Sequence, residues 1–292
     1  MKNIPLLRPN AILIVFISAF SIMLSSYQAF TQEYKIKTIV IDAGHGGKDG
    51  STRGLYSTEK DVALKTALNL GAAIEANMKD VKVIYTRTED VFIPLYERIG
   101  IANNAKADLF ISIHCNDMPV YRSTVITGYK KNSKGKKVPI RSTVSRKSTN
   151  TRGVETFVSG MGRVNEQDEA IKRENASIFL EENYKENYEG FDQSNPEDAI
   201  ILGLMKNTFR TQSLKLARLV QDQYVNAGRI NRGVQEKSLA VLARAGMPAI
   251  LTEIGFISNP DEEDYMNSEA GQKEIVDCLL KAIENYKKNV EG

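Results

Sequence analysis

The sequence predicts a single α/β domain, in which a mixed, mostly parallel sheet carries helices on both faces and a helical segment is inserted. The chain has 292 residues and 42% hydrophobic composition, enough for a large apolar core. Short β-branched runs alternate with amphipathic helical stretches between about residues 38 and 116, and again after residue 213. In such sheets, ligands bind beyond the carboxyl ends of the strands.

The first 30 residues are typical of a secretory signal peptide. Lys2 and Arg8 precede the apolar run AILIVFISAFSIML, which ends in small and polar residues. Because this run is shorter than the roughly 20 residues that span a bilayer, a cleaved signal is favoured over a retained anchor. We therefore expect an exported protein, periplasmic or associated with the cell wall, whose folded domain covers residues 34–292.

The N-terminal half of this domain has the pattern of three strands and two helices. KTIVIDAG, VKVIYTR and ADLFISIHCN are read as strands, and IPLYERIGIANNAKA as a helix. Thr58 and Asp61 have capping-box spacing before apolar residues that recur at helical intervals up to Met78. Glu59 is therefore expected in the first turn of a helix.

The middle of the chain interrupts this alternation with two segments of opposite charge. Residues 130–152 contain nine Lys and Arg and no acidic residue, so we expect a solvated, mobile basic loop over 117–152. VETFVSG then reads as a strand. The inserted segment, 163–210, is acidic and contains one helical stretch, EQDEAIKRENASIFLEENYKENY, whose partial apolar stripe predicts weak docking.

The C-terminal part returns to regular patterning. SLKLARLVQDQYVNAG is an amphipathic helix, SLAVLARAG and AILTEIG read as strands, and EAGQKEIVDCLLKAIENYKKN is a closing helix. The formal net charge is only +3, so we expect no nucleic-acid partner.

Both histidines of the chain stand at the ends of expected strands. They occur in IDAGHGG and ISIHCND, as His45 and His114. A catalytic zinc site needs three protein ligands and an open position, and the third ligand is often a carboxylate. Glu59 is the best candidate, since a glycine-rich loop separates it from His45. The alternative is that Glu59 merely stabilises a helix N-terminus.

Glu253 is an acid inside the apolar strand AILTEIG. A buried carboxylate is costly unless it is paired, coordinated or protonated. At the strand end Glu253 could take a proton from water and return it to a leaving amine. The alternative is a structural salt bridge to Arg98 or Arg244.

Several motifs together resemble the zinc-dependent N-acetylmuramoyl-L-alanine amidases of the third amidase family, of the cell-division type. They are IVIDAGHGGKDG, TEKDVAL, TRTED, ERIGIANNAKADLFISIHCND and MPAILTEIGFISNPDEE. The resemblance implies Zn²⁺ on His45, Glu59 and His114, with Glu253 as catalytic glutamate. The implied reaction is hydrolysis of the amide between N-acetylmuramic acid and L-alanine in peptidoglycan, during daughter-cell separation.

The same resemblance extends to the inserted segment. In cell-division amidases an inserted helix places a glutamate on the zinc until an activator with a LytM-type domain displaces it. KRENASIFLEENY resembles that helix, with Glu174 as the best match for the blocking residue and Glu181 and Glu182 nearby. The resemblance therefore implies an autoinhibited enzyme and a LytM-type partner.

Other functions fit parts of the sequence. A zinc peptidase that cuts stem peptides would need the same metal site, and a catalytically inactive wall-binding regulator would keep the fold. GHGGKDG has glycines before a helix but lacks the spacing of a phosphate-binding P-loop. The basic loop could bind acidic stem peptides or an anionic surface.

Overall fold

The computed structural model describes residues 35–118, 120–160, 168–183 and 196–292. The expected signal peptide, 1–30, lies outside these residues. No helix in the described ranges is both long and apolar enough to cross a membrane.

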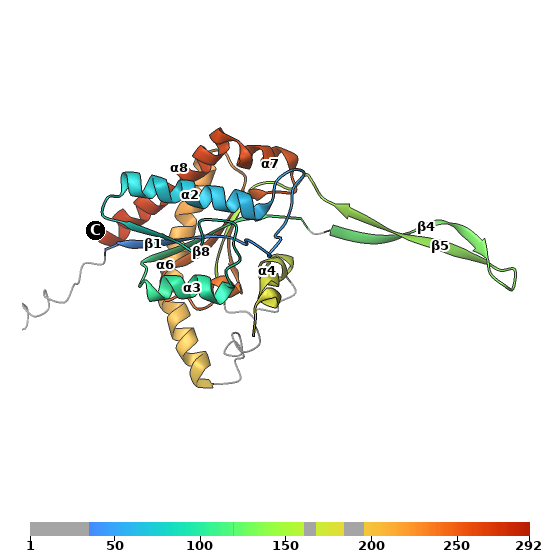
Figure 1. Ribbon diagram of the computed structural model, residues 1–292, viewed down its shortest axis with the longest axis horizontal. Helices are drawn as coiled ribbons and strands as arrows, with labels where there is room; N and C mark the ends of the chain where they lie inside the picture. Colours follow the sequence, from blue (N-terminus) through green and yellow to red (C-terminus); the bar gives the residue numbers. More distant parts are fainter. Residues whose placement is uncertain (1–34, 119, 161–167, 184–195) are drawn as a thin grey trace, which may run out of the picture. The chain divides into compact units, whose positions relative to one another are not determined.

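A sheet forms the centre of the fold, with helices on either side (Figure 1). It has six strands in the order β2-β1-β3-β8-β6-β7. Strands β2, β1, β3 and β8 are parallel, β6 runs antiparallel to β8, and β7 is parallel to β6. This confirms the predicted mixed, mostly parallel sheet. The strands are β1 (Thr38–Ala43), β2 (Lys82–Tyr85), β3 (Leu109–Asn116), β6 (Val154–Ser159), β7 (Asn231–Lys237) and β8 (Ala249–Phe256).

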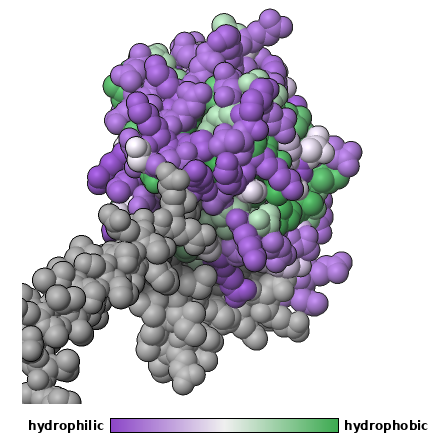
Figure 2. Space-filling model, turned by 90° about the vertical axis from the view of Figure 1, so that its left-hand side faces the viewer, coloured by the Kyte–Doolittle hydropathy of each residue, from purple (hydrophilic) through white to green (hydrophobic). Residues whose placement is uncertain are grey.

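Helices cover both faces of this sheet, because successive strand residues point to opposite sides. In β1, Ile39 and Ile41 join one hydrophobic cluster, whereas Val40 joins the other. The first cluster receives residues from α2 (Glu59–Asn77), α6 (Pro196–Asn226) and α8 (Glu269–Glu291), and the second from α3 (Leu95–Asn104) and the 3₁₀ helix η3 (Ala240–Leu242). Helix α7 (Pro260–Asn267) precedes α8. The face of the molecule in Figure 2 is mostly hydrophilic, with small apolar patches between polar side chains.

The basic segment is a β-hairpin, and the prediction of a mobile loop over 117–152 is wrong. Strands β4 (Val120–Lys131) and β5 (Lys137–Lys147) pair antiparallel over their full length (Figure 1). The turn between them is organised by Asn132, whose side-chain oxygen accepts bonds from the backbone N–H groups of Lys134 and Lys136. β-branched residues in both strands favour pairing despite the high charge.

The inserted segment also differs from the expected single helix. It contains the short helix α4 (Glu169–Glu174) and the 3₁₀ helix η1 (Ala176–Leu180), while residues 161–167 and 184–195 are outside the description. Asp168 caps α4 through the N–H groups of Ala170 and Ile171. The segment assigned to 163–210 also overlaps α6, which begins at Pro196.

Two further predictions near the C-terminus need correction. SLAVLARAG is not a strand, since its apolar centre forms η3. The preceding polar segment forms β7 instead, at the edge of the sheet. An edge strand whose residues are exposed or only partly buried lacks the clear apolar alternation by which strands are recognised.

Candidate metal centre

His45 lies in the loop after β1, in a backbone conformation that needs support. Its φ is +58°, and the next residue, Gly46, has a φ of +126°. The buried Arg98 of α3 donates to the carbonyl oxygens of Ala43 at 2.7 Å and His45 at 2.6 Å. Arg98 also pairs with Asp42 at 2.9 Å. Arg98 therefore stabilises the His45 loop, and the alternative of a salt bridge between Arg98 and Glu253 is not realised, because Arg98 pairs with Asp42.

Glu59 and His114 come from adjacent elements. Glu59 is the first residue of α2, as predicted, and its Oε2 accepts a bond from Thr52 Oγ1 at 2.7 Å. Its Oε1 accepts from the backbone N–H of Cys115 at 3.0 Å, which ties the carboxylate to the end of β3. His114 packs closely against Gly44, where a Cβ would lie 2.5 Å from the imidazole.

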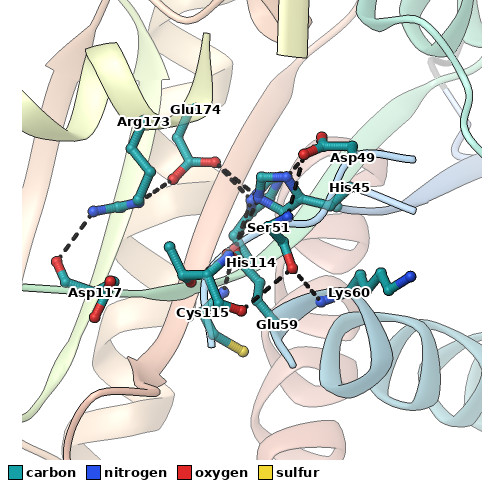
Figure 3. Close-up of polar contacts among 12 residues, drawn as sticks. His45, Asp49, Ser51, Glu59, Lys60, His114, Cys115, Asp117, Arg173 and Glu174 are labelled. Carbon is teal, nitrogen blue, oxygen red and sulfur yellow. Dashed lines mark hydrogen bonds and ion pairs between the residues drawn. The ribbon is translucent and has the colours of Figure 1, made fainter. Parts of the chain in front are cut away.

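The three predicted ligands converge with Glu174 at one buried point (Figure 3). Glu59 Oε1 is 3.2 Å from His45 Nε2 and 3.1 Å from His114 Nδ1. Glu174 Oε2 is 2.8 Å from His114 Nδ1 and 3.5 Å from His45 Nε2. One ligand atom from each of the four residues lies within 4.8 Å of the others.

Asp49 orients one of the imidazoles. Its Oδ2 is 2.8 Å from His45 Nδ1, so His45 Nε2 is left to face the cluster. A carboxylate behind a histidine ligand is common in metal sites, where it fixes the tautomer and ring orientation.

The donor set suits a metal such as Zn²⁺, because two imidazoles and two carboxylates are among its usual ligands. His45 Nε2 is buried and lacks a hydrogen-bond partner. Buried polar atoms are normally satisfied, so an unpartnered imidazole nitrogen that faces two carboxylate oxygens is suited to a cation between them.

Glu253 lies beside this cluster on β8. It is in register with His114 of β3 on one side and with Glu155 of β6 on the other. Its Oε1 is 3.2 Å from a terminal nitrogen of Arg173, and its Oε2 is buried without a partner. Burial, followed by the negative charge of Glu174, raises the pKa of Glu253 well above its usual range. The salt bridge that the sequence left open is thus made by Arg173.

Arg173 connects the two carboxylates. Its Nε donates to Glu174 Oε1 at 2.7 Å, and a second nitrogen donates to the backbone oxygen of Asp117 at 3.1 Å (Figure 3). Burial opposes the charge of Glu174, but His114 and Arg173 outweigh it and hold the pKa of Glu174 well below its usual value. Burial lowers the pKa of His114, yet Glu174 and Glu59 together raise it to about 9.

The structure distinguishes Glu174 from the other two acids of the inserted segment. Glu181 Oε1 accepts the backbone N–H of Leu95 at 2.7 Å, so it attaches η1 to the start of α3. Glu182 is exposed. Asp49, Thr52 and Arg173 carry no sequence signal that marks them as site residues, although Asp49 stands only four positions after His45.

Comparisons with known proteins identify the family of this chain. Residues 39–285 match the family model described as N-acetylmuramoyl-L-alanine amidase. The chain is 29% identical over 258 residues to the amidase AmiC of Neisseria meningitidis serogroup B, and 27% over 250 residues to AmiC of Escherichia coli O6:H1. Each alignment covers 85% of this chain and 52% of the relative, so the chain spans about half the length of these proteins.

Solved structures show the same fold. An N-acetylmuramoyl-L-alanine amidase from Clostridium difficile 630 is 26% identical with a TM-score of 0.56, covering 87% of this chain and 97% of that one. The CwlD amidase from Clostridioides difficile, solved in complex with the GerS lipoprotein, has 20% identity and a TM-score of 0.57, covering 87% and 99%. Because the family model matches well over half of the sequence, the chain belongs to the N-acetylmuramoyl-L-alanine amidase family.

Proposed function

We propose that this protein is an exported zinc-dependent amidase that hydrolyses the bond between N-acetylmuramic acid and L-alanine in peptidoglycan, during wall remodelling and daughter-cell separation. The observation that carries the proposal is the convergence of His45, Glu59, His114 and Glu174, with Glu253 alongside. Family membership supports the choice of bond.

His45, Glu59 and His114 would hold the zinc, which when bound supplies a Lewis acid that polarises the scissile carbonyl. Glu253 would take the proton from the attacking water and pass it to the nitrogen of L-alanine as the amide C–N bond breaks. The products are a lactyl carboxylate on the glycan and a stem peptide with a free amino group. Asp49 and Thr52 are positioning residues for His45 and Glu59.

Glu174 would keep the enzyme inactive. A catalytic zinc site keeps one position open, and a fourth protein ligand closes it. Three contacts hold the blocking segment in place besides Arg173: Asp168 pairs with Lys237, and the Asn175 side chain bonds the backbone of both Ser238 and Ala240. Activation therefore requires a partner that pulls α4 away, and the family resemblance suggests a LytM-type activator.

The test measures zinc content and release of peptides from purified sacculi by the mature chain. We expect one zinc per chain, no activity in Glu253→Ala, and basal activity in Glu174→Ala that exceeds wild type. Glu169→Ala is the matched control, since Glu169 lies on the same helix with a 63% exposed side chain.

Mass analysis of the products identifies the bond. Intact stem peptides with L-alanine at the amino end support the amidase, whereas fragments cut within the peptide would assign a peptidase instead. The metal site would be refuted if His45→Ala, Glu59→Ala and His114→Ala all bound zinc as well as wild type. Equal basal activity in Glu174→Ala and Glu169→Ala would refute self-inhibition.

A further inference from the structure

The β4–β5 hairpin, residues 120–147, is built unlike the rest of the domain. In the described part of the chain its two strands pair with each other and with no third strand. An isolated two-stranded hairpin is marginally stable in water, because it has no hydrophobic face to bury. Large apolar side chains are nevertheless exposed on it, including Ile126 at 54% and Tyr129 at 63%. Exposed apolar side chains on a hairpin without a supporting sheet are typical of a binding surface.

The charge of the hairpin has one sign. It contains nine Lys and Arg residues, and no acidic residue occurs between Asp117 and Glu155. No ion pair joins the described basic side chains of the hairpin to a carboxylate elsewhere. Charge complementarity therefore favours an anionic partner for this hairpin.

The register gathers several of these groups on one face. Residues paired across the strands share a face, and the faces alternate along each strand. A bulge between Ile126 and Gly128 shifts the phase of β4 by one residue, so that Ile126 and Tyr129 point to the same side. We call this side the basic face, and its members are Arg122, Ile126, Tyr129, Lys131, Lys137 and Arg141.

Two kinds of partner fit this hairpin poorly. A second copy of the chain would bring two basic hairpins together, and Pro139 and the lysines blunt the free strand edges against pairing. A bilayer is disfavoured because the turn and its flanks, residues 130–137, carry five lysines and no apolar side chain. The tip would therefore not enter hydrocarbon.

We propose that the basic hairpin binds the carboxylate-bearing stem peptides of peptidoglycan and retains the enzyme on the wall. A flexible polyanion can contact the basic face and the lysines of the turn at the same time. A flat anionic surface could contact only one of these two groups at once. Exposed Lys and Arg contacts with carboxylates are individually weak, so retention depends on many contacts made together. The identity of the polymer rests on the proposed function, whereas the anionic character of the partner rests on the hairpin alone.

The test compares two mature chains with the same charge change. The first carries Arg122→Gln, Lys131→Gln, Lys137→Gln and Arg141→Gln on the basic face. The control carries four Lys→Gln changes at exposed positions outside the hairpin, Lys82, Lys106, Lys281 and Lys288. Both also carry Glu253→Gln, so that the sacculi are not digested during co-sedimentation.

We expect the basic-face variant to bind purified sacculi about tenfold more weakly, because it loses four exposed charge contacts that are individually weak. The control variant should bind like the Glu253→Gln parent. Sacculi whose carboxylates have been amidated should retain little of that parent, and salt should release it from untreated sacculi.

Equal binding by the two variants, or undiminished binding to amidated sacculi, would overturn the proposal. Retention on phosphatidylglycerol vesicles but not on sacculi would also overturn it and assign a membrane partner. Hydrolysis of soluble muramyl-peptide fragments, measured in a Glu174→Ala chain with Glu253 intact, reports the proposed amidase function separately. Basic-face substitutions should leave that hydrolysis unchanged.

Discussion

Arg173 lies 3.2 Å from the carboxylate of Glu253 and donates a second bond to Glu174 at 2.7 Å, so one guanidinium holds both the proposed general base and the proposed blocking residue. Both carboxylates are buried, and each would be costly without a cation beside it. In the proposed blocked state, the cation that pairs with Glu174 therefore also pairs with Glu253.

Replacing Arg173 should therefore weaken the closed state. Arg173→Gln leaves two adjacent carboxylates without their cation, and we expect basal hydrolysis of sacculi to rise by about tenfold, equivalent to ~1.4 kcal/mol. Arg173→Lys, which keeps the charge but not the two-sided bonding, should give a smaller rise. Dye release from labelled sacculi without an activator measures both, and unchanged rates in both variants would contradict the linkage.

Gly44 should be necessary for zinc binding although it is not a ligand. A methyl group there would lie 2.5 Å from the imidazole of His114, so Gly44→Ala should displace that ring and lower zinc content. Gly50→Ala is the control, because nothing lies within 4 Å of its Cβ position in the same loop. Atomic absorption on the purified variants, with circular dichroism to verify folding, separates the two. Full zinc occupancy in Gly44→Ala would argue against His114 as a ligand.

Arg98 should be essential for stability as well as for the loop that carries His45. Arg98 and Asp42 are 1% and 0% exposed, and Arg98→Met leaves a buried carboxylate unpaired. We expect a loss of about 3–5 kcal/mol in the free energy of unfolding, measured by urea denaturation. Adding Asp42→Asn should restore part of this loss. Arg218→Met, at an exposed position of α6, should change stability by less than about 0.5 kcal/mol.

Glu263 of α7 should confer pH-dependent stability. Its carboxylate accepts bonds from the backbone N–H groups of Leu55, Tyr56 and Ser57 and from the Ser57 hydroxyl, which fixes the loop before α2. Burial alone would raise the pKa of Glu263, but these bonds lower it overall. The stabilisation is therefore complete above the unfolded-state pKa of about 4.3 and is lost as pH falls through the lower folded-state pKa.

Glu263→Gln should cost about 2 kcal/mol at pH 7, since its amide group cannot accept all four bonds. Denaturation at several pH values measures the difference from wild type, which should shrink below about pH 4. Glu284→Gln, on the exposed side of α8, should show no such difference. A wild-type advantage that stays constant down to low pH would mean that the carboxylate charge is not responsible.

The sequence alone was sufficient for five of the six strands of the central sheet and for most of the candidate site. Buried strands are visible as β-branched runs, and His45 and His114 stand at the ends of two of them, which pair in parallel and so meet at one edge. Glu59 was identified by a helix start and Glu253 by its apolar neighbours, both of which are local signals. These four residues do converge beside one another.

Tertiary structure decided the remainder, because it depends on contacts between distant segments. Charge composition suggested a loop over 117–152, but cross-strand pairing makes a hairpin there, and pairing leaves little trace in local composition. Glu174 rather than Glu181 reaches the histidines because of where α4 and η1 dock. Arg173 bonds Glu253 only because the fold brings together two residues that are 80 positions apart in the chain. Local patterns report which residues are buried, whereas the partners of buried charges are set by packing.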